Sequence, residues 1–276
     1  MTGIDRIIEN ALSEDIHTGD ITTQAVVRQG GTARAILKAK EEMVLAGIQV
    51  AARVFHLLDG AISFTPRFAD GERLSSGDIM AELSGDAAFL LQGERVALNL
   101  LQRMSGIATL TAQYVAAVSG TGARVVDTRK TAPGLRILEK YAVRVGGGFN
   151  HRTGLYDGVL IKENHIAAAG GITEAVARAR AYIPHTMKVE IETETLDQVA
   201  EALAAGADII MLDNMDLDAM RRAVALIGGK ALVEASGGVN LDTIRGIAET
   251  GVDIISVGAL THSARAMDIS MLLEGC

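Results

Sequence analysis

Positively charged side chains are concentrated between residues 127 and 152, in a chain that is acidic as a whole. This stretch contains Arg129, Lys130, Arg136, Lys140, Arg144 and Arg152, whereas the 276-residue chain has a net charge of -8. Residues 123–162 contain eight Lys or Arg against three Asp or Glu, and the rest of the chain contains 18 against 31. Arginine binds carboxylates through paired donors, and lysine binds phosphate as a point charge. The segment therefore predicts a site for a small, highly anionic ligand.

The composition disfavours a nucleic acid or a membrane as the partner of this segment. Nucleic-acid-binding arms are usually polar and of low complexity, but Leu135, Leu138 and Val145 are interspersed here and indicate folded structure. The isoelectric point near 5.3 argues against a general nucleic-acid or anionic-membrane surface. No apolar run approaches about 20 residues, and the only cysteine is Cys276. We expect a cytoplasmic protein without membrane spans or intrachain disulfides.

The elements that must position these side chains form an alternating pattern from residue 123 onward. Short β-branched runs alternate with stretches of helical periodicity, and we predict strands at 123–128, 157–162, 187–192, 208–213, 231–236 and 253–258. Strands that alternate with helices form parallel sheets. Six strands are two fewer than a closed eight-stranded barrel has, so an incomplete barrel and a doubly wound sheet both stay open. In either fold, ligands bind at the carboxyl ends of the strands.

Residues 24–106 have a different pattern and predict a smaller α/β domain. Strand-like runs at 31–47, 61–74 and 78–85 precede a long helical stretch at 89–118. The first fifteen residues have the pattern of a short amphipathic helix.

Polar residues and glycines follow each predicted strand of the second part. They are Asp127, Thr128, Arg129 and Lys130; Lys162, Glu163, Asn164 and His165; Glu190 and Glu192; Asp213 and Asn214; Glu234, Ser236, Gly237 and Gly238; and Ser256 and Gly258. Solvated loops are polar in any protein, but the agreement of six clusters favours one shared site.

Some of these residues also have structural interpretations. Thr131 and Pro133 resemble the cap and early proline of a helix that glycines 146–148 end. The basic residues within that helix lie four apart, which favours a solvated face; they are Arg136, Lys140 and Arg144.

Carboxylates and glycines near the later strand ends predict binding of a metal and of phosphate. Glu190 and Glu192 alternate along one strand face and Asp213 ends the next strand, which suits magnesium held together with substrate phosphates. Glu190 could instead pair with Lys188. Gly237 and the glycine after it precede a predicted helix start, which together would cradle phosphate. The six histidines lack zinc-ligand spacing.

At this point the sequence is similar to a known family. Residues 127–166, DTRKTAPGLRILEKYAVRVGGGFNHRTGLYDGVLIKENHI, resemble almost residue for residue the central motif of quinolinate phosphoribosyltransferases. The resemblance extends over nearly the whole chain, through EDIHTGDIT (14–22), ERVALNLLQRMSGIAT (94–109), DIIMLDN (208–214) and VEASGGVN (233–240). Minor departures are Ala132, where a second Thr is usual, and Val145, where Cys is frequent. Neither carries charge.

The resemblance implies a fold, a reaction and an assembly. The implied fold is a small N-terminal α/β sandwich domain, residues 1–107, followed by an incomplete parallel α/β barrel, residues 108–276, with a C-terminal tail that could return to the first domain. The implied reaction joins quinolinate to phosphoribosyl pyrophosphate, giving nicotinate mononucleotide, pyrophosphate and carbon dioxide in NAD biosynthesis. It requires Mg²⁺ and no organic cofactor. The implied assembly is a homodimer, or a higher oligomer, with sites completed across the interface.

The resemblance also implies roles for individual residues. Quinolinate carboxylates would be held by Arg103 of a partner subunit and by Arg129, His151, Arg152 and Lys162. Lys130 and Lys162 would face the phosphates, Glu192 and Asp213 the ribose hydroxyls and magnesium, and Ser236, Gly237 and Gly258 the 5′-phosphate. Of these, Lys130, Lys162, Glu192 and Asp213 are the predicted catalytic residues.

Three alternatives remain beside this interpretation. Lys162 at a strand end could serve a Schiff-base lyase, or the chain could be a phosphosugar-binding module without catalysis. The third alternative is the paralogous molybdenum-transport-associated relative, whose central motif diverges around residues 155–166.

Overall fold

A computed structural model of the chain describes residues 3–28 and 30–274. Cys276, the only cysteine, lies outside the described residues. Among the residues that are described, no helix is both long enough and apolar enough to cross a membrane. The described residues form two compact units: one comprises those up to Ala112, those from Thr131 to Gly147 and those from Ser263 onward, and the other comprises Gln113–Lys130 and Gly148–His262. The predicted domain boundary after residue 107 stays a prediction.

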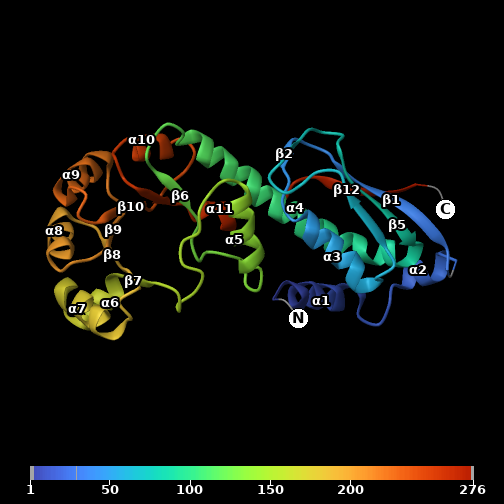
Figure 1. The fold of residues 1–276 in the computed structure, drawn as a ribbon, viewed down its shortest axis with the longest axis horizontal. Helices are drawn as coiled ribbons and strands as arrows, with labels where there is room; N and C mark the ends of the chain where they lie inside the picture. Colours follow the sequence, from blue (N-terminus) through green and yellow to red (C-terminus); the bar gives the residue numbers. More distant parts are fainter. Residues whose placement is uncertain (1–2, 29, 275–276) are drawn as a thin grey trace. The chain divides into compact units, whose positions relative to one another are not determined.

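The first unit combines helices with an antiparallel sheet (Figure 1). Its helices are α1 Gly3–Ile16, α2 Ile21–Val26, α3 Ile48–Leu58, α4 Ala87–Ala117, which ends in the second unit, and α5 Arg136–Val145. Its strands are β1 Thr32–Ala39, β2 Met43–Val44, β3 Ser63–Pro66, β4 Arg73–Leu74, β5 Ile79–Asp86 and β12 Ile269–Glu274. The sheet order is β12-β1-β5-β3, with β2 and β4 paired separately. Buried positions alternate along β1, and Phe55 of α3 packs on Phe64 of β3.

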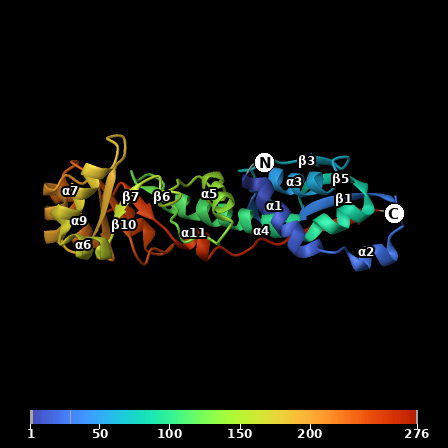
Figure 2. The same ribbon diagram turned by 90° about the horizontal axis from the view of Figure 1, so that it is seen from below.

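The second unit contains the six strands predicted between residues 123 and 258. They are β6 Arg124–Val126, β7 Val159–Ile161, β8 Val189–Thr193, β9 Ile209–Asp213, β10 Leu232–Ser236 and β11 Ile254–Ser256. The helices are α6 Glu163–Ala169, α7 Ile172–Tyr182, α8 Leu196–Ala204, α9 Leu217–Ile227, α10 Ile244–Ala248 and α11 Ala259–His262. Helices α8 and α9 lie outside the sheet (Figures 1 and 2). Buried side chains such as Ile191, Ile210 and Ile255 form the core.

The strand order decides between the two architectures that the sequence left open. All pairs in this sheet are parallel, and the order is β6-β11-β10-β9-β8-β7. Neighbours follow chain order from β7 to β11 without the reversal that defines a doubly wound sheet, and β6 then joins β11. Within the described residues, β6 and β7 are the open edges, and Phe149 makes an isolated bridge to Val126 of β6. The fold is therefore an incomplete barrel, as the family resemblance implied.

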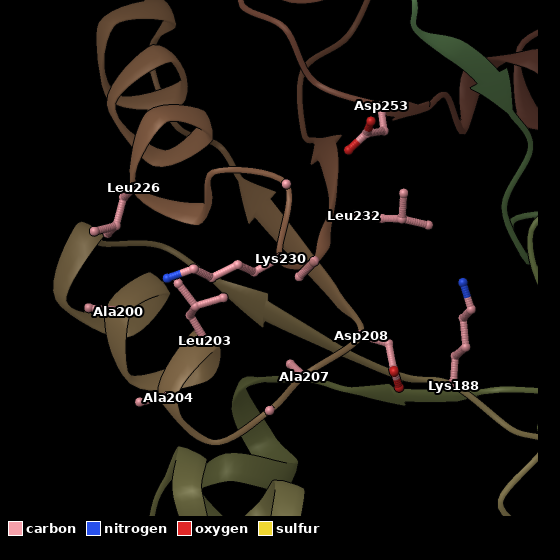
Figure 3. A pocket seen from close by; sticks show the side chains of 13 residues that line it. Lys188, Ala200, Leu203, Ala204, Ala207, Asp208, Leu226, Lys230, Leu232 and Asp253 are labelled. Carbon is pink, nitrogen blue, oxygen red and sulfur yellow. The ribbon is translucent and has the colours of Figure 1, made fainter.

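Aspartates fix the amino-terminal ends of these strands. Asp208 precedes β9 and accepts a hydrogen bond from the N–H of Val189 (2.7 Å), and Asp253 precedes β11 and accepts one from Val233 (2.8 Å). Both aspartates line a cavity of about 780 Å³, together with the exposed Lys188 (Figure 3). The carboxylates of these aspartates bind the backbone of neighbouring strands. The aspartates therefore hold adjacent strands together at this end of the barrel.

Three local predictions were wrong. Helix α5 begins at Arg136 after Leu135, so Thr131 does not cap it; the N–H of Ala132 is bound instead by Glu139 from within the helix (3.2 Å). Of the three basic residues that were predicted to form a solvated face of α5, Arg144 is exposed and Arg136 is half-buried, but Lys140 is buried. The predicted helix start after Gly237 comes later than expected, since α10 begins at residue 244 and has five residues. The glycine turn therefore lines its site without a helix terminus.

Candidate active site

A cavity of about 830 Å³ lies at the carboxyl ends of the barrel strands, within the second unit. Its lining residues are Thr128, Arg129, Lys130, His151, Arg152, Leu160, Lys162, Glu192, Met211, Asp213, Asn214, Glu234, Ser236, Gly237, Gly238, Val239, Ser256, Gly258, Ala259 and His262. Parallel strands direct their carboxyl ends to the same edge, which is why residues from six segments meet here. Every predicted site residue except Arg103 lines this cavity.

The arginines of the cavity come from the loops after β6 and before β7, whereas Lys162 directly follows β7. Arg129 and Arg152 are close enough to affect one another: burial and the neighbouring Arg129 charge lower the pKa of Arg152. The Arg152 guanidinium also donates to the carbonyl of Gly158 (3.3 Å). Two guanidinium groups that repel one another are stabilised electrostatically when an anion lies between them. This part of the cavity suits a ligand with carboxylate groups.

Carboxylates occupy the adjoining strand ends. Glu192 at the end of β8 accepts a hydrogen bond from Lys162 (Nζ to Oε2, 2.7 Å), and Asp213 at the end of β9 accepts one from Asn214 (2.8 Å). Each carboxylate has a second oxygen besides the one that is engaged. Oxygen donors at two adjacent strand ends fit magnesium, which binds through one or two carboxylates together with substrate phosphates.

Gly258 allows the loops after β6 and β11 to approach one another closely. A Cβ at Gly258 would lie 3.0 Å from Cδ of Lys130 and 3.2 Å from Nε2 of His262. The buried Thr261 hydroxyl donates to the carbonyl of Lys130 (2.8 Å) and ties its backbone to α11. The loops after β6 and β11 are therefore fitted to one another around Gly258.

Three ionisable side chains form a largely buried cluster, and two of them, His151 and Glu234, also line the cavity. His151 Nε2 lies 3.0 Å from Glu190 Oε2 and 3.7 Å from Glu234 Oε1. Burial and the charge of Glu190 raise the pKa of Glu234 to about 8, so Glu234 holds a proton at neutral pH. Burial lowers the pKa of His151, but the two carboxylates raise it more, and the net shift is upward.

The ligand atoms of this cluster lie within 4.8 Å of one another, a spacing that a metal ion could bridge. The hydrogen bond at the other ring nitrogen argues against that role. His151 Nδ1 accepts a hydrogen bond from the N–H of Arg152 (2.7 Å), which places the ring proton on Nε2. A metal-binding histidine donates from its second nitrogen instead. Glu190, 3.0 Å from Nε2, and the N–H of Arg152 at Nδ1 therefore orient the His151 ring.

Family models match both parts of the chain. Residues 20–105 match the N-terminal domain of quinolinate phosphoribosyl transferase, and residues 107–272 match its C-terminal domain. The chain belongs to this family. A relative from Bacillus subtilis, named probable nicotinate-nucleotide pyrophosphorylase [carboxylating], is 47% identical over 96% of this chain and 92% of its own. The nicotinate-nucleotide pyrophosphorylase [carboxylating] of Mycobacterium leprae is 45% identical over 96% of this chain and 95% of its own.

Solved structures agree with the fold. NadC from Streptococcus pyogenes is 49% identical, with a TM-score of 0.95 over 98% of this chain and 96% of that chain. The nicotinate-nucleotide pyrophosphorylase from Francisella tularensis is 42% identical, with a TM-score of 0.94 over 99% and 96%.

Arg103 is the predicted site residue that lies in the first unit. Its Nε and Nη2 donate to Glu139 Oε1 (2.8 and 2.6 Å), and Glu139 is 1% exposed in its side chain. The Arg103 side chain keeps 31% of its surface accessible. Glu139 therefore holds the guanidinium at the surface of its own unit.

Sequence reasoning did not predict the contacts of Glu234 and Asn214, or that His262 lines the cavity. Glu234 and Asn214 were identified as strand-end residues, but nothing in the sequence indicated that Glu234 would meet Glu190 and His151. The alternation of strand residues places Glu234 and Ser236 on one face and offered the only signal. The suggested Lys188–Glu190 pair is wrong, because Glu190 is buried against His151 while Lys188 lies at the opposite end of the barrel.

Proposed function

We propose that the protein transfers the phosphoribosyl group of phosphoribosyl pyrophosphate to quinolinate, with loss of carbon dioxide, and so forms nicotinate mononucleotide and pyrophosphate. One observation carries the proposal: a single cavity brings arginines together with carboxylates and with the glycines of two strand-end turns. The family relationship and the names of the relatives support the same reaction.

The two kinds of anion would bind on different sides of the cavity. Arg129 and Arg152 provide forked donors for the carboxylates of quinolinate, beside the His151 ring. Lys130, near Gly258, provides a point charge for phosphate. Lys162, 2.7 Å from Glu192, lies where it can contact either substrate.

Transfer would begin when the pyridine nitrogen attacks the anomeric carbon and the bond to pyrophosphate breaks. Glu192 and Asp213 lie at adjacent strand ends, where their negative charge would stabilise a sugar that becomes cationic. When magnesium is bound by these two carboxylates and the phosphates, it would neutralise the departing pyrophosphate. The ring nitrogen then carries positive charge, so the electron pair of the breaking carbon–carboxylate bond can remain on the ring as carbon dioxide leaves, and that carbon then takes up a proton from water.

The proposed assembly is a homodimer in which Arg103 of one subunit completes the site of the other. The position of Arg103 supports this assembly. Glu139 holds Arg103 in the first unit, and Arg103 is not among the residues that line the cavity of its own chain.

Incubation with quinolinate, phosphoribosyl pyrophosphate and magnesium tests the reaction directly. We expect nicotinate mononucleotide, pyrophosphate and carbon dioxide in equal amounts. Nicotinate should be a poor substrate, because a buried charged group that loses its partner costs about 2–5 kcal/mol. Equal turnover of both acids would contradict the carboxylate assignment. Binding of phosphoribosyl pyrophosphate without any turnover would instead indicate a phosphosugar-binding module.

A further inference from the structure

Asn214, the residue directly after β9, has an unusual backbone conformation. Among the residues that the structure describes, His17 and Asn214 are the non-glycine residues with positive φ, and φ of Asn214 is 55°. This left-handed region is costly for residues with a Cβ, and asparagine is among those that tolerate it best. A residue retained in this conformation at a cavity wall indicates that its side chain is needed in a particular direction.

The hydrogen bonds of Asn214 show which neighbouring groups its side chain and backbone orient. Its backbone N–H donates to the carbonyl of Ser236 on the neighbouring strand (2.9 Å). Its side-chain Nδ2 donates to Oδ2 of Asp213 (2.8 Å). Because Oδ2 is engaged by the amide, Asp213 presents Oδ1 as its oxygen for a ligand. The amide is a neutral donor, so it orients the carboxylate without cancelling its charge.

The same side chain also touches the glycine turn after β10. A Cβ at Gly237 would lie 2.6 Å from Cγ of Asn214 and 3.0 Å from its backbone nitrogen, and φ of Gly237 is +95°. The Asn214 amide therefore occupies the space above the Gly237 α-carbon. Two left-handed residues at the ends of adjacent strands pack on one another, and both line the cavity.

We propose that Asn214 is a positioning residue for the phosphosugar half of the site: its amide fixes both the carboxylate of Asp213 and the turn at Gly237. The inference rests on the proposed function, in which Asp213 and Gly237 bind the ribose and its 5′-phosphate. It is specific to that half of the site, because the contacts of Asn214 do not include the arginines that would hold quinolinate.

Asn214→Gly tests this role without disturbing the backbone, since glycine adopts positive φ readily. The affinity for phosphoribosyl pyrophosphate, measured by calorimetry with magnesium and without quinolinate, should fall about tenfold, the effect of one lost hydrogen bond. The KM for phosphoribosyl pyrophosphate should rise similarly, and the KM for quinolinate should stay within about twofold. The melting temperature should not fall, because the substitution relieves the left-handed conformation.

Asn214→Asp is the second variant, because it keeps the shape but removes the donor and adds a charge beside Asp213. It should weaken phosphoribosyl pyrophosphate binding at least as much as Asn214→Gly does. His17→Gly is the matched control: it relieves the other left-handed residue, which lies in the first unit, and should leave both KM values unchanged.

Phosphoribosyl pyrophosphate binding close to that of the unmodified protein in both Asn214 variants would overturn the inference. Equal rises in both KM values, with a lower melting temperature, would also overturn it and show a role in folding alone. If the unmodified protein binds phosphoribosyl pyrophosphate but does not turn over quinolinate, the proposed function fails while the effect of Asn214 on binding is still measured.

Discussion

Replacement of Glu139 by glutamine removes one charge from a buried ion pair and nearly preserves its shape. Glu139 Oε1 accepts two hydrogen bonds from Arg103, and Oε2 accepts one from the N–H of Ala132. Removal of one partner from a fully buried pair costs about 3–5 kcal/mol. Arg103 keeps 31% of its side chain accessible and can be hydrated, and glutamine retains an acceptor. We therefore expect Glu139→Gln to lower the free energy of unfolding by about 2 kcal/mol.

A surface pair of equal length provides the control. Arg178 and Glu174 are also 2.6 Å apart, but their side chains are 62% and 53% exposed. Glu174→Gln should change stability by less than about 0.5 kcal/mol. Urea unfolding of both variants measures the difference, with two spectroscopic probes because the chain has two compact units. Equal losses in the two variants would refute the argument that burial, rather than distance, sets the strength of the Arg103 pair.

Other predictions concern metal, assembly and pH. Asp213→Ala should abolish magnesium-dependent turnover in a folded protein; full activity with excess chelator would contradict a metal role at this carboxylate. Arg103→Ala and Lys162→Ala proteins, each nearly inactive, should regain about a quarter of the wild-type sites when refolded together as a two-fold dimer; confirmed heterodimers without recovered activity would exclude a cross-subunit Arg103. The pKa of Glu234 is raised from 4.5 to about 8 in the folded state. Between pH 4.5 and pH 8, Glu234 therefore keeps its proton in the folded state and has lost it in the unfolded state. The free energy of unfolding should therefore fall as pH rises through this window, and urea titrations at pH 5 and pH 8 should show a smaller fall for Glu234→Gln.

The periodicity of the chain was sufficient to predict the six parallel strands and the edge at which the site forms. Side chains that follow β-branched runs must lie at strand ends, and parallel strands bring those ends together. That is why Arg129, Lys162 and Asp213 could be placed in one cavity before any distance was known. The distribution of charge predicted only a small anionic ligand. The family resemblance added which anions these would be.

Local patterns failed at the start of α5. Thr131 and Pro133 have the chemistry of a helix start, but α5 begins at Arg136. The carboxylate of Glu139, which is held by Arg103 of α4, binds the N–H of Ala132 instead. The position of Glu139 depends on its ion pair with Arg103, which is far away in the sequence, and the local pattern could not show this contact.

The tertiary structure alone decided which of the strand carboxylates line the cavity and which are buried away from it. Glu190 and Glu192 share a strand face, so periodicity cannot distinguish them. Glu192 is two residues nearer the carboxyl end of β8 and lines the cavity, whereas Glu190 is buried against His151. The cluster of His151, Glu190 and Glu234 is drawn from three segments far apart in the chain. Alternation along a strand gives the face of a residue, but its depth and its partners depend on strand register and barrel curvature, which are set only when the sheet assembles.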